Sequence, residues 1–190
     1  MSLQSVGQLQ ALNDIMREQF GTWAVCSAMV LGVAGGNGLE HADPAQYETV
    51  YGVDVNGAYL WETAARFAAW GPRLQLIEAD LTDENVCLPR AELLIADLLV
   101  EYIGCACFQK VVRQVCPRYV SCVIQTDGAV GWVSDSPYLH VFDSLEAVHR
   151  SIEPPALGDA LRAIGYRQLS AGIRPLPNSK QLIRMDFAAS

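Results

Sequence analysis

The stretch VLGVAGGNG, residues Val30 to Gly38, places a short apolar run directly before a cluster of glycines. From Leu39 onward the sequence becomes compatible with a helix. Two structures explain so bare a backbone: a loop that lets a nucleotide-like ligand approach the peptide groups, or a tight strand-to-helix turn without a ligand. The rest of the chain has to distinguish them.

Length and composition predict a single domain over residues 1–190. The chain has 190 residues, of which 51% are hydrophobic and 18% charged. Its formal net charge is −8 and its 13 basic residues are scattered, which argues against a nucleic-acid partner. No apolar run approaches the roughly 18 to 20 residues that span a bilayer, and the N-terminus lacks a signal-peptide core. We therefore expect a cytoplasmic protein without a membrane partner.

The six cysteines do not have the spacing of a metal site. Cys105 and Cys107 form a C-x-C pair, with no second pair and no histidine nearby to complete four ligands. Most of the cysteines lie in apolar segments such as VSCVI, where a free thiol behaves as a small buried hydrophobe. The sequence predicts no bound metal.

Apolar segments alternate with helical patterns through the first two thirds of the chain. Because the predicted strands are almost continuously hydrophobic and are separated by helices, both faces of a parallel sheet should be covered. The predicted strands are Ser27 to Val33, Thr49 to Val55, Leu74 to Glu78, Leu93 to Leu98 and Tyr119 to Gln125. The predicted helices are residues 5–20, Leu39 to Tyr47, Gly57 to Trp70 and Ile103 to Val115.

The C-terminal third departs from this alternation. A helix from Ala156 to Ile164 precedes two strands, Tyr166 to Ile173 and Lys180 to Phe187, that have no helix between them. Adjacent strands joined by a short loop pair antiparallel. The sequence therefore predicts an α/β fold with a doubly wound, seven-stranded, mostly parallel sheet that ends in an antiparallel hairpin.

Acidic residues follow three successive strands at the place where such sheets bind ligands. The ligand crevice of an open parallel sheet lies beyond the carboxyl ends of its strands. The glycine loop follows the first predicted strand, and Asp54, Asp80 and Asp97 follow the next three. A carboxylate about 20 residues past a glycine loop can accept hydrogen bonds from both hydroxyls of a ribose. Asp54 stands at that spacing, although each acid also suits a plain turn or a helix cap.

These segments resemble the motifs of the class I S-adenosylmethionine-dependent methyltransferases. VLGVAGGNG, YGVDVN (51–56), LIEADLTD (76–83) and AELLIADLLVEYI (91–103) are similar to the first four motifs of that family. GYRQLSAGIRP and KQLIRMDF are similar to its sixth and seventh strands, the last of which is reversed. The resemblance covers nearly the whole chain and implies a Rossmann-like methyltransferase fold with S-adenosyl-L-methionine as cofactor.

The resemblance also implies roles for individual residues. The loop backbone would approach the methionine part of the cofactor, Asp54 would bind the ribose, Asp80 would face the adenine amino group, and Asp97 would lie by the methionyl amino group or the methyl acceptor. The implied cofactor-binding residues are Gly32, Ala34, Gly35, Gly36, Asn37, Gly38, Asp54, Val55, Asn56, Asp80, Leu81, Asp97 and Leu98. The chain departs from the family at Gly32, where an acid is frequent, and at Ala34, where the first loop glycine is usual. The missing acid removes one partner for the cofactor's ammonium group.

Methyl transfer needs mainly alignment and desolvation, and it needs a base only when the acceptor carries a proton. The candidates for a catalytic base are Asp97, Glu101 and Tyr102, at or just beyond the fourth predicted strand. We expect a small-molecule acceptor. Besides an N-terminal helix within residues 1–25, only residues 130–152 are left to build an acceptor pocket, either as a substrate-side lid or as a helix packed into the core. We therefore expect a shallow site or a homodimer that contributes its walls.

Two other classes of function fit parts of the sequence. An NAD(P)-binding oxidoreductase would use the same glycine loop and Asp54, although the loop is not G-x-G-x-x-G and no substrate domain is evident. A catalytically silent cofactor-binding or scaffold protein is favoured by Gly32. Binding of S-adenosylhomocysteine, compared with NAD and NADP, would separate these alternatives.

Overall fold

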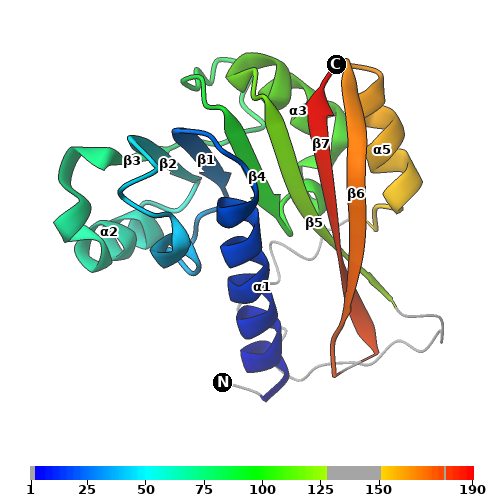
Figure 1. Ribbon diagram of the computed structural model, residues 1–190, viewed down its shortest axis with the longest axis horizontal. Helices are drawn as coiled ribbons and strands as arrows, with labels where there is room; N and C mark the ends of the chain where they lie inside the picture. Colours follow the sequence, from blue (N-terminus) through cyan, green and yellow to red (C-terminus); the bar gives the residue numbers. More distant parts are fainter. Residues whose placement is uncertain (1–2, 128–150, 178) are drawn as a thin grey trace.

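The computed structural model describes residues 3–127, 151–177 and 179–190, and its strands form one sheet with helices on both faces (Figure 1). Residues 130–150 of the predicted lid lie outside the described residues. The helices are α1 (Leu3–Thr22), η1 (Leu39–His41), α2 (Gly57–Arg66), η2 (Ala68–Arg73), α3 (Val100–Val115) and α5 (Pro154–Arg162). The strands are β1 (Ser27–Leu31), β2 (Thr49–Asp54), β3 (Leu74–Glu78), β4 (Leu93–Asp97), β5 (Tyr119–Asp127), β6 (Tyr166–Pro175) and β7 (Lys180–Ala189).

The strands follow the order β3-β2-β1-β4-β5-β7-β6. The pairs from β3 to β5 are parallel, and β7 is antiparallel to both β5 and β6. This arrangement confirms the predicted sheet and its C-terminal hairpin. The direction in which the strands are added reverses between β1 and β4, so the crevice of a doubly wound sheet lies beyond the carboxyl ends of these two strands.

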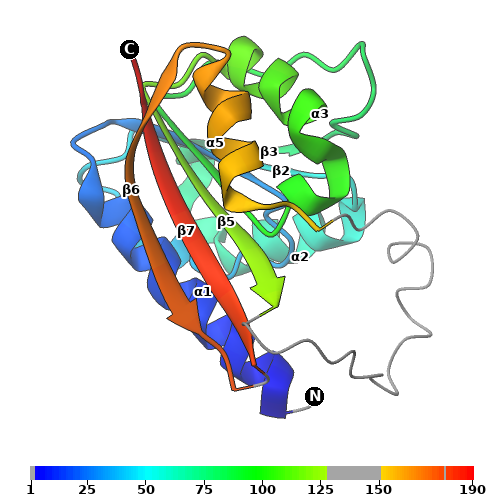
Figure 2. The same cartoon turned by 90° about the vertical axis from the view of Figure 1, so that its right-hand side faces the viewer.

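Both faces of the central strands β1 and β4 are buried, which explains why these strands read as continuous apolar runs. Leu93 and Ile95 of β4 belong to a buried cluster that includes Phe20 of α1. The alternate residues Leu94 and Ala96 belong to the cluster that contains α3 and α5. Figure 2 shows α3 and α5 on one side of the strands and α1 on the other.

Three predicted helices differ from the observed ones by three residues or more at one end, whereas the bounds of α1 and α5 differ by two residues. The segment after the glycine loop forms only one turn, η1, and is not helical up to Tyr47. Helix α2 ends at Arg66, and the chain continues as η2, where Gly71 has a non-helical φ of 55°. Helix α3 begins at Val100, three residues earlier than predicted, and is interrupted at Gly104 (φ 75°, ψ 158°). Glu101 therefore lies in the first turn of α3.

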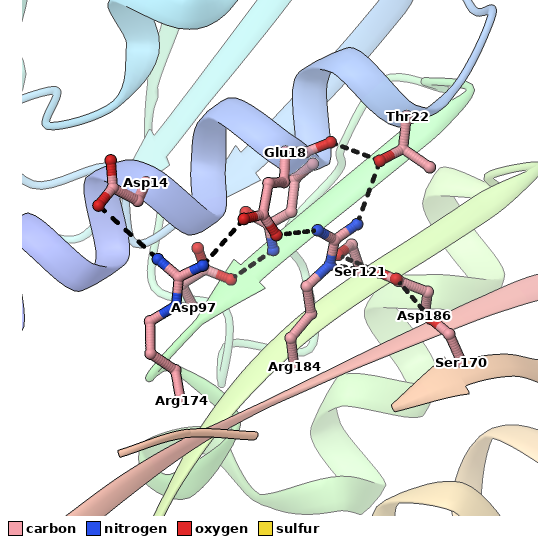
Figure 3. A network of polar contacts seen from close by, with 10 residues as sticks. Asp14, Glu18, Thr22, Asp97, Ser121, Ser170, Arg174, Arg184 and Asp186 are labelled. Carbon is pink, nitrogen blue, oxygen red and sulfur yellow. Dashed lines mark hydrogen bonds and ion pairs between the residues drawn. The ribbon is translucent and has the colours of Figure 1, made fainter. Parts of the chain in front are cut away.

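Ion pairs hold α1 to the β6–β7 hairpin (Figure 3). Arg174 Nη2 lies 2.8 Å from Glu18 Oε1, and Arg184 Nη1 lies 3.2 Å from Glu18 Oε2. Arg184 also donates through Nε to Asp186 Oδ1 at 3.0 Å, and the Ser121 hydroxyl donates to the same oxygen at 2.6 Å. These contacts join the two ends of the sequence and place α1 over the ends of the central strands.

Candidate functional site

The glycine loop is tied to β2 where β1 ends. The backbone N–H groups of Gly32 and Val33 both donate to the carbonyl of Val53, at 2.8 and 3.0 Å. Gly32 (φ 68°) and Ala34 (φ 45°) adopt left-handed backbone conformations, and both are exposed. The first half of the loop thus presents bare backbone to solvent at the carboxyl edge of the sheet.

The glycines in the second half of the loop, Gly36 and Gly38, are required for a different reason. A Cβ atom on Gly36 would lie 2.8 Å from Phe67 Cε2, and one on Gly38 would lie 2.5 Å from Met16 Sδ. Both glycines also have positive φ, 75° and 88°. The close approach of the protein's own side chains therefore requires glycine at these two positions, with no need for a ligand.

Asn37, between these glycines, faces helix α1. Its Oδ1 accepts a hydrogen bond from Asn13 Nδ2 at 3.0 Å, and its Nδ2 donates to the carbonyl of Leu9 at 3.2 Å. Asn13 also donates to Glu40 Oε1 at 2.7 Å. The loop is consequently braced by α1, and the side chain of Asn37 is engaged on both of its polar atoms.

Asp54 lies at the end of β2, against the open half of the loop. Its Oδ2 accepts a hydrogen bond from the Ala34 backbone N–H at 2.8 Å, and its Oδ1 accepts one from the Asn56 N–H at 2.9 Å. A carboxylate offers about four lone-pair sites, so each oxygen retains capacity for a further donor. Next to it, the Val55 residue is 65% exposed. Asn56 caps α2 by accepting from the Ala58 N–H at 3.0 Å.

The end of β3 lies beside Asp54, because the Ala79 N–H donates to the Asp54 carbonyl at 3.0 Å. Asp80 is exposed, and its Oδ1 accepts from both the hydroxyl and the backbone N–H of Thr82, which lowers the pKa of the carboxyl. Leu81 is half-buried against the core. The structure thus brings Asp54, Asp80 and Leu81 to one edge, as the spacing predicted.

Asp97 ends β4 and faces α1. Its Oδ1 accepts from Gln19 Nε2 at 2.9 Å, whereas its Oδ2 is buried and has no partner in the described chain. Burial raises the pKa of Asp97 to about 7, and the Gln19 hydrogen bond and Arg184 oppose that shift. The next residue, Leu98, has a φ of 55° and donates through its N–H to the Val123 carbonyl at 2.8 Å.

The other two candidate bases lie in the first turn of α3. Glu101 is only 1% exposed, its Oε1 accepts from the Gln125 backbone N–H at 2.8 Å, and its Oε2 has no partner among the described residues. Burial raises the pKa of Glu101. Tyr102 is half-buried, and its pKa is raised by burial and by the neighbouring Glu101 charge.

No group of three or more histidine, cysteine or acidic side chains suited to a metal ion occurs in the described part of the chain. The prediction that most cysteines are buried is wrong. Cys122 is buried and two others are half-buried, but Cys26, Cys87 and Cys116 are exposed. Cys26 precedes β1, Cys116 follows α3, and Cys87 lies in the connection between β3 and β4. An apolar sequence neighbourhood does not guarantee burial at such positions. No helix within the described ranges is long and apolar enough to cross a membrane.

Sequence reasoning missed two side chains that shape this edge. Gln19, the partner of Asp97, is 78 residues away in the sequence and reads as one polar position of an amphipathic helix. Leu99 Cδ1 would lie 3.3 Å from a Cβ on Gly32, so an apolar side chain borders the position where the family often has an acid. No sequence signal marks either contact.

The sheet order and the reversed last strand define the fold of the class I methyltransferases, and comparison with solved structures agrees. The magnesium protoporphyrin IX methyltransferase ChlM from Synechocystis PCC 6803, solved with bound S-adenosylmethionine, superposes with a TM-score of 0.70 at 13% identity, over 97% of this chain and 81% of that one. The N-methyltransferase NodS from Bradyrhizobium japonicum WM9, in complex with S-adenosylhomocysteine, gives 0.71 at 11% identity, over 95% and 86%.

The same fold also occurs in a protein named for a different reaction. The [4+2]-cyclase SpnF superposes with a TM-score of 0.70 at 10% identity, over 94% of this chain and 80% of that one. No protein-family model matches the sequence, and comparison with curated protein sequences gives no match either. At these identities the comparisons establish the fold, and the reaction has to be argued from the site.

Proposed function

We propose that this protein is an S-adenosylmethionine-dependent methyltransferase that acts on a small-molecule acceptor. The observation that carries the proposal is the contact between Asp54 and the Ala34 backbone N–H, 2.8 Å long, at the carboxyl edge of β1 and β2. It places a carboxylate beside the exposed residues Gly32 and Ala34 of the glycine loop, next to the point where strand order reverses. Structural neighbours that share this sheet were solved with the cofactor or its product.

The exposed residues of this edge fit a nucleoside and its amino-acid extension. The remaining lone pairs of Asp54 suit the ribose hydroxyls, and Val55 and Leu81 offer apolar surface for an adenine ring. The open backbone of Gly32, Ala34 and Gly35 would lie against the methionine part. We assign Gly36, Asn37 and Gly38 to the support of the loop, because they contact α1 and Phe67.

The other predicted positions complete the assignment. Asn56 holds the start of α2 in place, Asp80 would face the adenine amino group, and Asp97 and Leu98 would border the reacting end. The cofactor supplies an activated methyl group, so the protein's work is to align it with the acceptor and to exclude water. A soluble intracellular location and a homodimer remain predictions.

Calorimetric titration with S-adenosylhomocysteine, NAD and NADP tests the proposal. We expect S-adenosylhomocysteine to bind, and NAD and NADP not to bind. Asp54→Asn should weaken the binding of S-adenosylhomocysteine by about tenfold or more, because charge-assisted hydrogen bonds are lost. Asp43→Asn is the matched control, since Asp43 Oδ1 likewise accepts from a backbone N–H two residues on, at 2.8 Å. Binding of NAD without S-adenosylhomocysteine would refute the proposal, and unaltered affinity in Asp54→Asn would refute the assignment of Asp54.

A silent cofactor-binding protein is the second candidate, and the specific observation behind it is Gly32. The position offers no carboxylate to an ammonium group, and Leu99 borders it. Incubation with methyl-labelled S-adenosylmethionine and a cell extract separates the two candidates. Transfer of label to an extract component supports the enzyme, and tight cofactor binding with no transfer supports the silent protein.

A further inference from the structure

The carboxylate of Glu101 takes the place of the next residue of β4 in the sheet. Backbone groups of alternate residues in a strand point to the same neighbour. The Val123 carbonyl accepts from the Leu98 N–H, so Val123 and Gln125 both face the β4 side of β5. β4 ends at Asp97, and the Gln125 N–H donates instead to Glu101 Oε1 at 2.8 Å. Glu101 therefore lies directly beyond the carboxyl end of β4, where a doubly wound sheet has its crevice.

The other carboxylate oxygen of Glu101, Oε2, lacks a hydrogen-bond partner among the residues that the structure describes. Glu101 is 1% exposed, and its Oε2 is a buried atom without a partner in the described part of the chain. A buried carboxylate oxygen without a donor costs free energy, because its hydration is lost and not replaced. Native proteins leave few such atoms, and each calls for an explanation.

A second unpartnered group lies on the adjoining strand. Thr126 Oγ1 is also buried without a partner among the described residues, and Thr126 follows the residue that binds Glu101. Strand alternation puts Thr126 on the same face as Ile124, which belongs to the cluster that contains α3. The hydroxyl of Thr126 thus lies on the α3 side of the sheet, as Glu101 does.

Asp97 belongs to a different environment. It has the same strand parity as Leu93 and Ile95, which face α1, and its carboxylate binds Gln19 of that helix (Figure 3 shows it among the residues of α1 and the hairpin). Its free oxygen is enclosed between the sheet and α1. Asp97 and Glu101 each have one oxygen without a partner among the described residues, and Glu101 is the one whose position continues the strand toward the crevice.

We infer that Glu101 and Thr126 form the acceptor subsite, and that the acceptor reacts through a hydroxyl group. This inference rests on the proposed function. A hydroxyl has one hydrogen to donate and lone pairs to accept with, which matches one unpaired carboxylate oxygen and one unpaired threonine hydroxyl. An amine attacks through its single lone pair, so it would have none left to accept from the Thr126 O–H, whereas a hydroxyl oxygen keeps a second lone pair for that bond.

The methyl transfer can be written with the acceptor hydroxyl, the cofactor and Glu101 alone. The acceptor oxygen forms a bond to the methyl carbon while the bond between that carbon and sulfur breaks, and its electron pair goes to sulfur. The hydroxyl proton passes to Glu101 Oε2. A methyl ether, a neutral thioether and a protonated glutamic acid are formed, and no further reactant is needed. The hydrogen bond from Thr126 would orient the attacking oxygen.

The test compares a hydroxyl compound with its methyl ether on the full-length protein saturated with S-adenosylhomocysteine. Phenol and anisole are titrated by ligand-observed NMR into the wild type, Glu101→Gln, Thr126→Val and the control Glu84→Gln. Glu84 is an exposed acid that pairs with Lys110 of α3 at 3.2 Å. Glutamine keeps an oxygen for the Gln125 N–H but removes the charge that attracts the phenol proton.

We expect phenol to bind the wild type and Glu84→Gln equally, and to bind Glu101→Gln about tenfold more weakly, as the loss of a charge-assisted hydrogen bond implies. Thr126→Val should weaken phenol binding as well. Anisole should bind Glu101→Gln and the wild type with the same affinity. Equal phenol affinity in Glu101→Gln and the wild type, or no phenol binding to the saturated wild type, would overturn the inference.

Titration of S-adenosylhomocysteine into the same variants separates this inference from the proposed function. The affinity for S-adenosylhomocysteine should change less than about threefold in Glu101→Gln, because Asp54 and the loop bind that molecule; a charge-assisted bond to it would cost tenfold. If the wild type does not bind S-adenosylhomocysteine, the proposed function fails. If the wild type binds S-adenosylhomocysteine but phenol binds the wild type and Glu101→Gln equally, only the assignment of the acceptor subsite fails.

Discussion

Substituting Asp97 by asparagine should reduce the loss of stability that this protein undergoes between weakly acidic and weakly basic pH. The carboxyl has a pKa of about 7 in the folded protein, against 3.8 for an unperturbed aspartate, chiefly because it is buried. The folded state therefore holds a proton that the unfolded chain releases, and stability falls as the pH rises from about 4 to about 7. Gln19 and Arg184 favour the charged form, and Asp186 and Glu101 oppose it.

The size of the effect follows from linkage. Three pKa units correspond to about 4 kcal/mol over the full range, of which about 2 to 3 kcal/mol falls between pH 5 and pH 8. Asparagine retains an oxygen for Gln19 Nε2 and cannot ionise, so Asp97→Asn should have a flatter pH profile and be the more stable protein at pH 8. Urea unfolding at pH 5, 6, 7 and 8 measures this. Parallel profiles for the two proteins, with Asp97→Asn less stable throughout, would refute the reasoning.

Two further perturbations test the loop and the placement of α1. Gly38→Ala should cost about 2 to 4 kcal/mol, because it adds a collision with Met16 to the strain of a positive φ. Gly165→Ala should cost only about 1 to 2 kcal/mol in the same urea experiment, because φ is 89° but, apart from its chain neighbours, no atom of the described residues lies within 4 Å of the added carbon. Equal costs would contradict the packing argument. The Glu18–Arg174 pair is part-exposed, so a double-mutant cycle should give about 0.2 to 1 kcal/mol at low salt and less in 0.5 M NaCl. A coupling above about 2 kcal/mol, or one that salt does not change, would show that the pair is not screened by solvent.

The predicted strands agree with the observed ones because their signal is local. A strand buried on both faces needs an apolar residue at nearly every position, and LLIAD and SAMVL meet that requirement without reference to any partner. The antiparallel hairpin follows equally from two strands with no room for a crossover. Helix limits were predicted less well. Gly104 interrupts α3, and the apolar pattern alone does not show that one turn precedes it.

The candidate site was predicted in part for the same reason. Asp54 and the glycine loop were expected together because each follows a strand of one parallel sheet, and the structure joins them through Ala34. Their proximity could therefore be predicted from their spacing in the sequence. The direction of a carboxylate after the strand ends does not follow from spacing, and Asp97 and Glu101 illustrate this, since one lies under α1 and the other completes the hydrogen bonding of β5.

The amino-acid order alone determined the layered α/β architecture, the hairpin at its end and the edge at which the acids gather, since hydrophobic periodicity and strand connection act over a few residues. Tertiary structure decided why Gly36 and Gly38 are glycines, which oxygens remain unpaired and which acid faces the crevice. Each of these depends on side chains from segments far apart in the sequence, such as Met16 against Gly38 or Gln19 against Asp97. Such contacts exist only after the chain has packed, because close packing and burial set their energies.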